Sequence, residues 1–340
     1  MFKEKGVFKM KLSVLDQAPI TAGNTAPDAL SKAVELAILA EELGYERIWM
    51  AEHHNTKGFA SSAPEITASY IAAKTNRIRV GTGGTMIMHY SPYKIAEVFK
   101  TLSALAPGRI DFGAGRAPGG DNYAMYALAE GRQPQVNNLY EKLQWTLDFL
   151  NDQAPQNPYY QSVTASPYNV VLPQSWLLGS SGNSAVQAGK MGMGYSYAQF
   201  FNGYMNRRVF DAYRSNFVPS PFMENPEIMI SYFVTVAESK EEAEYQAKPA
   251  DIARLLFNRG QVDMLRMTPE EAKDYPLTEM DRIWIEENRS QHFVGTAKEV
   301  ADRLLQEQEE YGFDEAMICT IPHSQEVRLN VYKLLAKELM

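Results

Sequence analysis

The sequence is poor in cysteine and has no long apolar run. Its single cysteine, Cys319, cannot form an internal disulfide bond, which suits a reducing compartment. No run approaches the ~18 apolar residues needed to cross a bilayer. The basic N-terminus lacks the apolar segment and cleavage site of a secretory signal. These absences predict a cytoplasmic protein without membrane contacts.

Positive charge is also scarce, because 33 Lys and Arg face 41 Asp and Glu, giving a net charge of −8. Without a Lys/Arg cluster to offset that charge, nucleic acid is not expected as a partner. Metal-binding spacings such as H-x-H or H-E-x-x-H do not occur, so no metal site is expected. The glycine-rich turn at 113–120 reads G-x-G-x-x-x-G, which is not the dinucleotide fingerprint.

Short apolar runs alternate with amphipathic stretches along the whole chain. This alternation favours one closed (β/α)8 TIM barrel over a doubly wound open sheet, because no linker or composition break divides the chain. The eight predicted strands are Lys11–Leu15, Arg47–Ala51, Ile78–Thr82, Arg109–Gly113, Ser175–Gly179, Gly194–Ala198, Glu227–Val236 and Ala316–Ile321.

Two segments fall outside the regular alternation. Residues 1–9 are expected to be an N-terminal extension to a single domain over 10–340, with Met10 as an alternative start. The polar, weakly periodic stretch Gln261–Asn288 predicts a lid or mobile excursion over the barrel mouth after strand seven, since long irregular segments in compact domains are often functional.

Active sites of such barrels lie where the strands end at their C-termini. Strand two ends in Glu52-His53-His54. Adjacent residues on a strand face opposite sides, so at most one histidine points into the mouth. That histidine could act as a general base or hydrogen-bond donor, although a packing role is equally compatible with its position.

Three further strand ends carry small or polar residues. The glycines Gly83 and Gly84 after strand three indicate a close backbone approach or core crowding. Arg116 follows strand four, and the Ser180–Ser184 turn opens a helix after strand five. Hydroxyls and free N–H groups at a helix start can bind an anion, or they can simply cap the helix. The neighbouring arginine favours the first interpretation, a phosphate-binding site.

Four motifs together resemble the bacterial luciferase-like flavin monooxygenase superfamily, over about Met10 to Leu339. They are E-H-H after strand two, V-G-T-G-G after strand three, R-I-D-F-G-A-G-R-A-P-G-G around strand four and L-G-S-S-G-N-S after strand five. The third motif is the most specific and resembles a subgroup of luciferase-family oxidoreductases.

The resemblance implies roles for the residues at these motifs. His53 matches the catalytic histidine beside the flavin ring, and Glu52 next to it is expected to bind the cofactor, whereas His54 is expected to be mainly structural. Gly83-Gly84 falls where the family often has a non-prolyl cis peptide. Arg116 matches a phosphate-binding arginine, and the phosphate-turn positions are occupied by Ser180, Ser181 and Ser184.

Several departures from luciferase argue against aldehyde light emission while keeping flavin binding. Ser180 stands where luciferase has glutamate, and Gly119 where it has tyrosine. A second phosphate-contacting arginine has no counterpart at 137–140, and Arg132 is the substitute that the sequence offers.

The resemblance therefore implies a monooxygenase that uses reduced FMN and O2 on a small organic substrate. A separate NAD(P)H:flavin reductase would supply the reduced flavin, and a homodimer through barrel helices two and three is expected. A deazaflavin (F420)-dependent oxidoreductase and a flavin-binding protein without turnover remain as alternatives.

Overall fold

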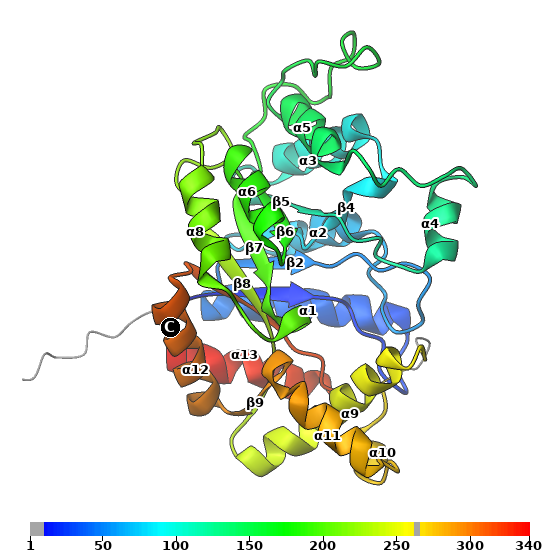
Figure 1. The fold of residues 1–340 in the computed structure, drawn as a ribbon, viewed down its shortest axis with the longest axis vertical. Coiled ribbons are helices and arrows are strands. Elements are labelled where there is room, and N and C mark those ends of the chain that lie inside the picture. The colour runs from blue at the N-terminus through cyan, green and yellow to red at the C-terminus, as the bar shows by residue number, and fades with distance from the viewer. Residues whose placement is uncertain (1–9, 262–265) are drawn as a thin grey trace, which may run out of the picture.

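The computed structural model describes residues 10–261 and 266–340 and contains a closed barrel of parallel strands surrounded by helices (Figure 1). The barrel closes because the last strand pairs in parallel with both the first and the seventh barrel strand. The eight barrel strands are β1 (Lys11–Asp16), β2 (Arg47–Met50), β3 (Arg79–Thr82), β5 (Ile110–Gly115), β6 (Gln174–Gly179), β7 (Gly194–Ala198), β8 (Ile228–Ala237) and β10 (Glu315–Cys319). The predicted (β/α)8 barrel is confirmed, and the open sheet was wrong.

Helices form the outer layer and return the chain from the end of each strand to the start of the next (Figure 1). They are α1 (Ala26–Leu43), α2 (Pro64–Lys74), α3 (Pro92–Leu105), α5 (Leu139–Leu150), α6 (Gly182–Lys190), α8 (Arg207–Asn216), α12 (Ala297–Tyr311) and α13 (Gln325–Leu339). Their ends follow ordinary sequence rules. In α1, for example, Thr25 and Asp28 form a capping box, and Gly44 ends the helix at φ 88°.

Additional elements decorate the barrel. The connection between β5 and α5 contains the helix α4 (Asn122–Leu128). The others are β4 (Thr85–Met86), η1 (Ile87–His89), α7 (Gln199–Asn202), α9 (Lys240–Asn258), α10 (Pro269–Lys273), α11 (Glu279–Glu287), η2 (Arg289–Gln291) and β9 (Phe293–Thr296). The weakly periodic stretch Gln261–Asn288 contains the two short helices α10 and α11, and helices as short as α10 give no clear helical period in a sequence.

The strand Gly194–Ala198 has the predicted limits, and the limits of the other barrel strands differ from the predicted ones by at most two residues. The fourth barrel strand, for example, is Ile110–Gly115 where Arg109–Gly113 was predicted. Strands that are buried on both faces have no polar alternation to mark their ends, so a glycine-rich continuation such as this one is easily cut short. The extension expected over residues 1–9 lies outside the described residues.

The barrel interior is filled from its N-terminal end. Arg47, at the start of β2, is buried and forms ion pairs of 2.9 Å with Asp111 on β5 and with Glu315 on β10. Above this network Trp49 and Trp176 pack edge to face, with ring centroids 5.7 Å apart. Because charged and aromatic side chains fill the lower barrel, the C-terminal ends of the strands are left to form a site.

Candidate active site

The C-terminal mouth gathers the residues of the four motifs that the sequence singled out. Glu52 and His53 follow β2, Gly83-Gly84 follows β3, Arg116 follows β5, and the serine turn follows β6. The strands β5 and β6 are direct neighbours, with Ala114 opposite Leu177. The end of β5 therefore lies beside the start of α6, as predicted.

Glu52 organises one side of the mouth. Its carboxylate is fully buried and accepts hydrogen bonds from the Met86 backbone N–H at 2.8 Å and from the Tyr90 hydroxyl at 2.7 Å. It also binds Nε2 of His54 at 2.8 Å. Both carboxylate oxygens thus have protein partners, so Glu52 acts on the mouth by fixing the residues around it.

The two neighbouring histidines have different surroundings. His54 donates its backbone N–H to Gly119 and its ring to Glu52, which fixes it between two loops. His53 instead stacks on Phe59, with ring centroids 4.6 Å apart and an interplanar angle of 23°. Its Nε2 atom is buried and has no hydrogen-bond partner among the described residues.

Burial also sets the charge of His53. Desolvation is the main cause that lowers its pKa to about 4, and the neighbouring His54 lowers it further while Glu52 opposes the shift. His53 is therefore neutral near pH 7. A neutral imidazole has one donor and one acceptor nitrogen, so His53 can exchange a hydrogen bond with a bound molecule through Nε2.

Gly83 and Gly84 are joined by a cis peptide bond, as expected from the sequence. A Cβ atom on Gly83 would lie 2.8 Å from Leu15 and 3.0 Å from Trp49. On Gly84 it would lie 2.8 Å from backbone atoms of Gly113 and Gly115. At Gly84 only glycine fits, because the neighbouring backbone of β5 cannot move aside, whereas a side chain at Gly83 would have to displace Leu15.

Arg116 carries the positive charge at the β5–β6 side of the mouth. Its guanidinium carbon lies 5.0 Å from the centre of the Tyr140 ring at the start of α5, a cation–π contact. Its buried Nε atom has no hydrogen-bond partner within the described parts of the chain. The tyrosine thus orients the guanidinium without using its hydrogen-bond donors.

The serine turn combines exposed and buried hydroxyls. Ser181 caps α6 and is exposed, and Ser180 before it is half-buried. Ser184 is fully buried, where its hydroxyl donates to the Ser181 carbonyl at 2.8 Å and lies 3.0 Å from the Tyr195 hydroxyl. Ser184 and the capping Ser181, whose hydroxyl oxygens are 3.3 Å apart, therefore shape the turn, while Ser180 and the first N–H groups of α6 can bind an anion together with the exposed Ser181 side chain.

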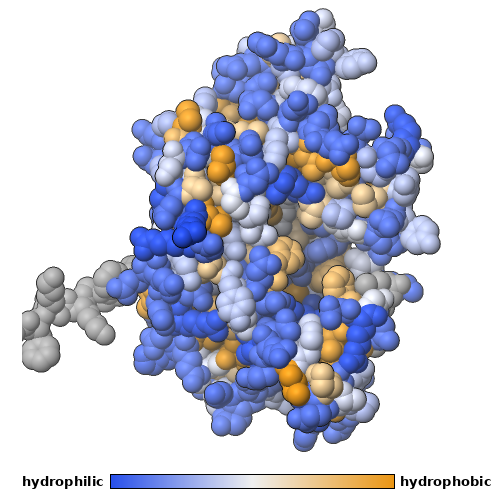
Figure 2. All heavy atoms as spheres, in the orientation of Figure 1, coloured by the Kyte–Doolittle hydropathy of each residue, from blue (hydrophilic) through white to orange (hydrophobic). Residues whose placement is uncertain are grey.

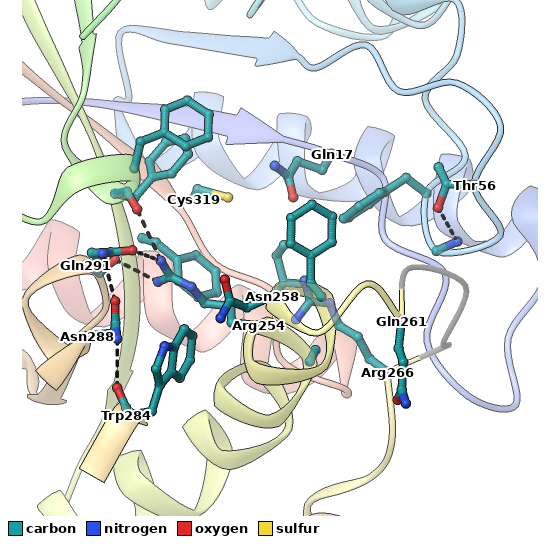
Figure 3. A pocket seen from close by; sticks show the side chains of 18 residues that line it. Gln17, Thr56, Arg254, Asn258, Gln261, Arg266, Trp284, Asn288, Gln291 and Cys319 are labelled. Carbon is teal, nitrogen blue, oxygen red and sulfur yellow. Dashed lines mark hydrogen bonds between the residues drawn. The ribbon is translucent and has the colours of Figure 1, made fainter. Parts of the chain in front are cut away.

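A cavity of about 560 Å³ opens at the same mouth on the side of β8, β10 and β1. Figure 2 shows this face hollowed near its centre, with apolar side chains gathered around the hollow. Figure 3 shows the lining side chains, which come from strand ends, from α9 and from the segment after it. The lining includes the aromatic residues Phe59, Phe200, Phe201, Phe233, Phe257 and Trp284.

The residues that line the cavity show where the segment Gln261–Asn288 lies. Gln261, Arg266, Trp284 and Asn288 all line it, so the described part of this segment lies at the mouth, as predicted. Residues 262–265, which belong to the same prediction, lie outside the described residues.

Some residues of the site were missed by sequence reasoning. Tyr140, Tyr195 and Phe59 are isolated aromatics whose roles depend on contacts between separate elements. The proposed substitute, Arg132, is exposed and pairs with Glu130. Among the described residues no cluster of metal-ligating side chains occurs, and no helix is long and apolar enough to cross a membrane.

Known proteins are similar to this chain in both sequence and fold. The family model described as luciferase-like monooxygenase matches residues 10–315. An N-acetyl-S-alkylcysteine monooxygenase of Bacillus subtilis (strain 168) is 37% identical, covering 97% of this chain and 98% of that protein. The protein in the crystal structure of apo-MsnO8 is 37% identical in sequence to this chain. The two structures superpose with a TM-score of 0.88, covering 97% of this chain and 98% of that chain.

Two more distant structures share the fold with a TM-score of 0.70 each. One is the oxygenating constituent of 3,6-diketocamphane monooxygenase from Pseudomonas putida in complex with FMN, at 17% identity and with 97% of this chain and 98% of that chain covered. The other is an F420-dependent secondary alcohol dehydrogenase with an F420-acetone adduct, at 15% identity and with 98% and 99% covered. The fold is thus found with both cofactors.

Proposed function

Because the chain belongs to the luciferase-like monooxygenase family, we propose that it is a monooxygenase that uses reduced FMN and O2 to oxidise a small organic substrate. The proposal treats residues 10–340 as one catalytic domain. The observation that supports it is that Arg116, after β5, and the exposed start of α6, after the neighbouring strand β6, lie on the same side of the mouth.

This corner fits the phosphate of FMN. A phosphate is close to dianionic near pH 7, and this chain has a net charge of −8, so a local positive potential is required. Arg116 supplies a fixed charge with an unused Nε donor. The α6 N–H groups with Ser180 and Ser181 supply the remaining donors, since a helix start carries partial positive charge.

The other side of the mouth fits the flavin ring. We assign the ring to the backbone at Gly83-Gly84, because these two residues carry no side chains that could project into the mouth. His53 presents a buried Nε2 atom without a partner in the described structure, and a heteroatom of a bound flavin ring would be a hydrogen-bond partner for it. Glu52 supports this seat by holding His54 and the backbone of Met86.

Reduced FMN would supply the oxygen-activating chemistry, and the protein would bind, orient and shield it. His53 would hold or accept one proton at Nε2, since its lowered pKa keeps the imidazole neutral. Phe59, which stacks on His53 and lines the cavity, would keep water away from the reacting atoms. The organic substrate would enter through that cavity.

We propose two protein partners, a flavin reductase and a second copy of this chain. The relative with bound FMN is named an oxygenating constituent, and this sequence shows no dinucleotide fingerprint. We therefore propose a separate NAD(P)H:flavin reductase. We also propose a homodimer through α2 and α3, which is supported by the exposed apolar residues Ile66, Tyr70 and Leu105.

One experiment separates this function from its alternatives. The protein is mixed anaerobically with reduced FMN or with reduced deazaflavin F420, air is added, and absorption spectra are recorded over time. A monooxygenase should bind reduced FMN and slow its reoxidation relative to free flavin. Tight binding of the deazaflavin alone would favour a dehydrogenase, and binding of FMN without any change in its reaction with air would indicate a flavin carrier.

A further inference from the structure

The cavity beside His53 has an apolar wall and a cationic wall. Its volume of about 560 Å³ is in the range of pockets that bury small organic ligands. Phe59 connects it to His53, and Phe233 and Ile321 add apolar surface from the strand ends. Two arginines, Arg254 and Arg266, also line it.

Arg254 is held in place by neutral oxygens. It lies on α9 and donates to the backbone carbonyls of Gln291 and Phe200, each at 3.3 Å, and to the side-chain oxygen of Gln291. Gln291 is itself held by Asn288 at 3.0 Å, as the dashed lines in Figure 3 show. The nearby Asp251 pairs with Arg289 and His292 instead.

Arg266 is anchored through its backbone, leaving its side chain to the cavity. Its carbonyl oxygen accepts a hydrogen bond from the Ala22 N–H at 3.0 Å. Its Nη1 atom is buried and has no partner among residues 10–261 and 266–340. Burial is the main cause that lowers the pKa of Arg266 to about 10, and the charge of Arg254 lowers it further.

No acidic side chain is among the described residues that line this cavity. The lining Cys319 does not compensate, because burial raises the pKa of its thiol to about 12 and keeps it protonated. Two guanidinium groups therefore line a cavity of mixed polar and apolar character without a counter-ion from the described lining, although Asp251, outside the lining, favours the charged form of Arg254. Buried charges are normally paired, so an anion from outside is the expected complement.

We propose that this cavity binds an organic anion, with its apolar body against the aromatic wall and its carboxylate or similar head group on Arg254 and Arg266. A guanidinium binds a planar carboxylate through two parallel hydrogen bonds, and Arg266 has an unused donor for this purpose. The inference rests on the proposed function in taking this ligand to be the substrate. The part to be oxidised is then the apolar end next to Phe59 and His53.

The test uses binding of probes to the full-length protein without flavin. Affinities for 2-naphthoate and for its neutral analogue 2-naphthamide are measured by isothermal titration calorimetry, with 2-naphthalenesulfonate to compare head groups. Wild type should bind naphthoate at least about tenfold more tightly than the amide, since only the acid forms charge-assisted hydrogen bonds. Arg266→Met should reduce that preference to near unity and leave the affinity for the amide unchanged.

The matched control is Arg282→Met, which removes the same charge from an exposed position on α11 that does not line the cavity. It should keep the wild-type preference. Unchanged amide binding shows that each variant retains the cavity, and Arg254→Met provides a second variant. Equal affinities for acid and amide in wild type, a preference that survives both cavity substitutions, or no binding of either probe at millimolar concentration would overturn the proposal. Failure of FMN binding alone would instead overturn the proposed function.

Discussion

The guanidinium of Arg116 lies over the ring of Tyr140, with 5.0 Å between the guanidinium carbon and the ring centre. The contact joins the end of β5 to the start of α5 and orients the charge that we assign to the FMN phosphate. Tyr140 offers an aromatic face and no anion, so Arg116 keeps its capacity to bind one.

Replacement of Arg116 should separate phosphate binding from ring binding. Charge-assisted hydrogen bonds contribute about 1.5–3 kcal/mol each, so Arg116→Ala should weaken binding of reduced FMN by roughly ten- to a hundredfold. Riboflavin lacks the phosphate, and its affinity should hardly change. Titration of both reduced flavins measures this. Equal losses for the two flavins would show that Arg116 serves the fold or the ring instead.

His53 should affect the coupling of the reaction more than flavin binding. In His53→Ala the phosphate contacts remain, so the affinity for reduced FMN should change by less than about threefold. The yield of oxidised substrate per flavin should fall and that of hydrogen peroxide should rise, because Nε2 no longer meets the reacting atoms. Unchanged coupling with a true substrate would remove His53 from the mechanism.

The lowered pKa of His53 also predicts a pH dependence of stability. The unfolded chain protonates this histidine near pH 6.5, whereas the folded protein does so only near pH 4. Stability should therefore fall as the pH drops through this window, by about 1–2 kcal/mol at pH 5 from this group. Urea unfolding of wild type and His53→Gln at pH 7.5 and pH 5.0 measures the difference.

The variant should lose less stability than wild type between these two pH values. His89 and His292, whose pKa values burial also lowers, are present in both proteins, so their contributions cancel in the comparison. Parallel losses in the two proteins would contradict the assignment of a depressed pKa to His53.

Gly84 should be intolerant of even one added methyl group. A Cβ atom there would lie 2.8 Å from the backbone of β5, which cannot move aside as a flexible side chain would. Gly84→Ala should lower the free energy of unfolding by about 1–3 kcal/mol, as overpacking usually does. Gly182→Ala is the control, because a Cβ atom at Gly182 meets nothing within 4 Å. Thermal or urea unfolding of both variants tests this, and similar stabilities would refute the packing argument.

The predicted homodimer can be broken at α2. Ile66 is 67% exposed and Tyr70, one turn later, is 57% exposed, which leaves an apolar stripe on the outer face of this helix. Ile66→Glu should convert a dimer into a monomer in light scattering at micromolar concentration. Ile283→Glu, on α11, should leave the dimer intact. A monomeric wild type would exclude this interface altogether.

The barrel and half of the mouth could be predicted because they depend on local patterns. Alternating apolar runs marked the strands, and the parallel arrangement brings residues at their C-terminal ends together, including His53 and Arg116. The residues that line the cavity show no comparable pattern in the sequence. Arg254 looks like an ordinary charged residue of an amphipathic helix, and Arg266 lies in an aperiodic stretch. Their roles depend on tertiary contacts, as does that of Tyr140.

The strand β8 is longer than the barrel requires. Its first part, Ile228–Phe233, pairs with β7 and β10, whereas Val234–Ala237 pairs with β9 after the excursion through α9, α10 and α11. The excursion thus leaves and rejoins the barrel at one strand, and its changes need not disturb the register of the others. Insertions and substitutions in this segment can therefore reshape one wall of the cavity while the pairing of the barrel strands stays the same.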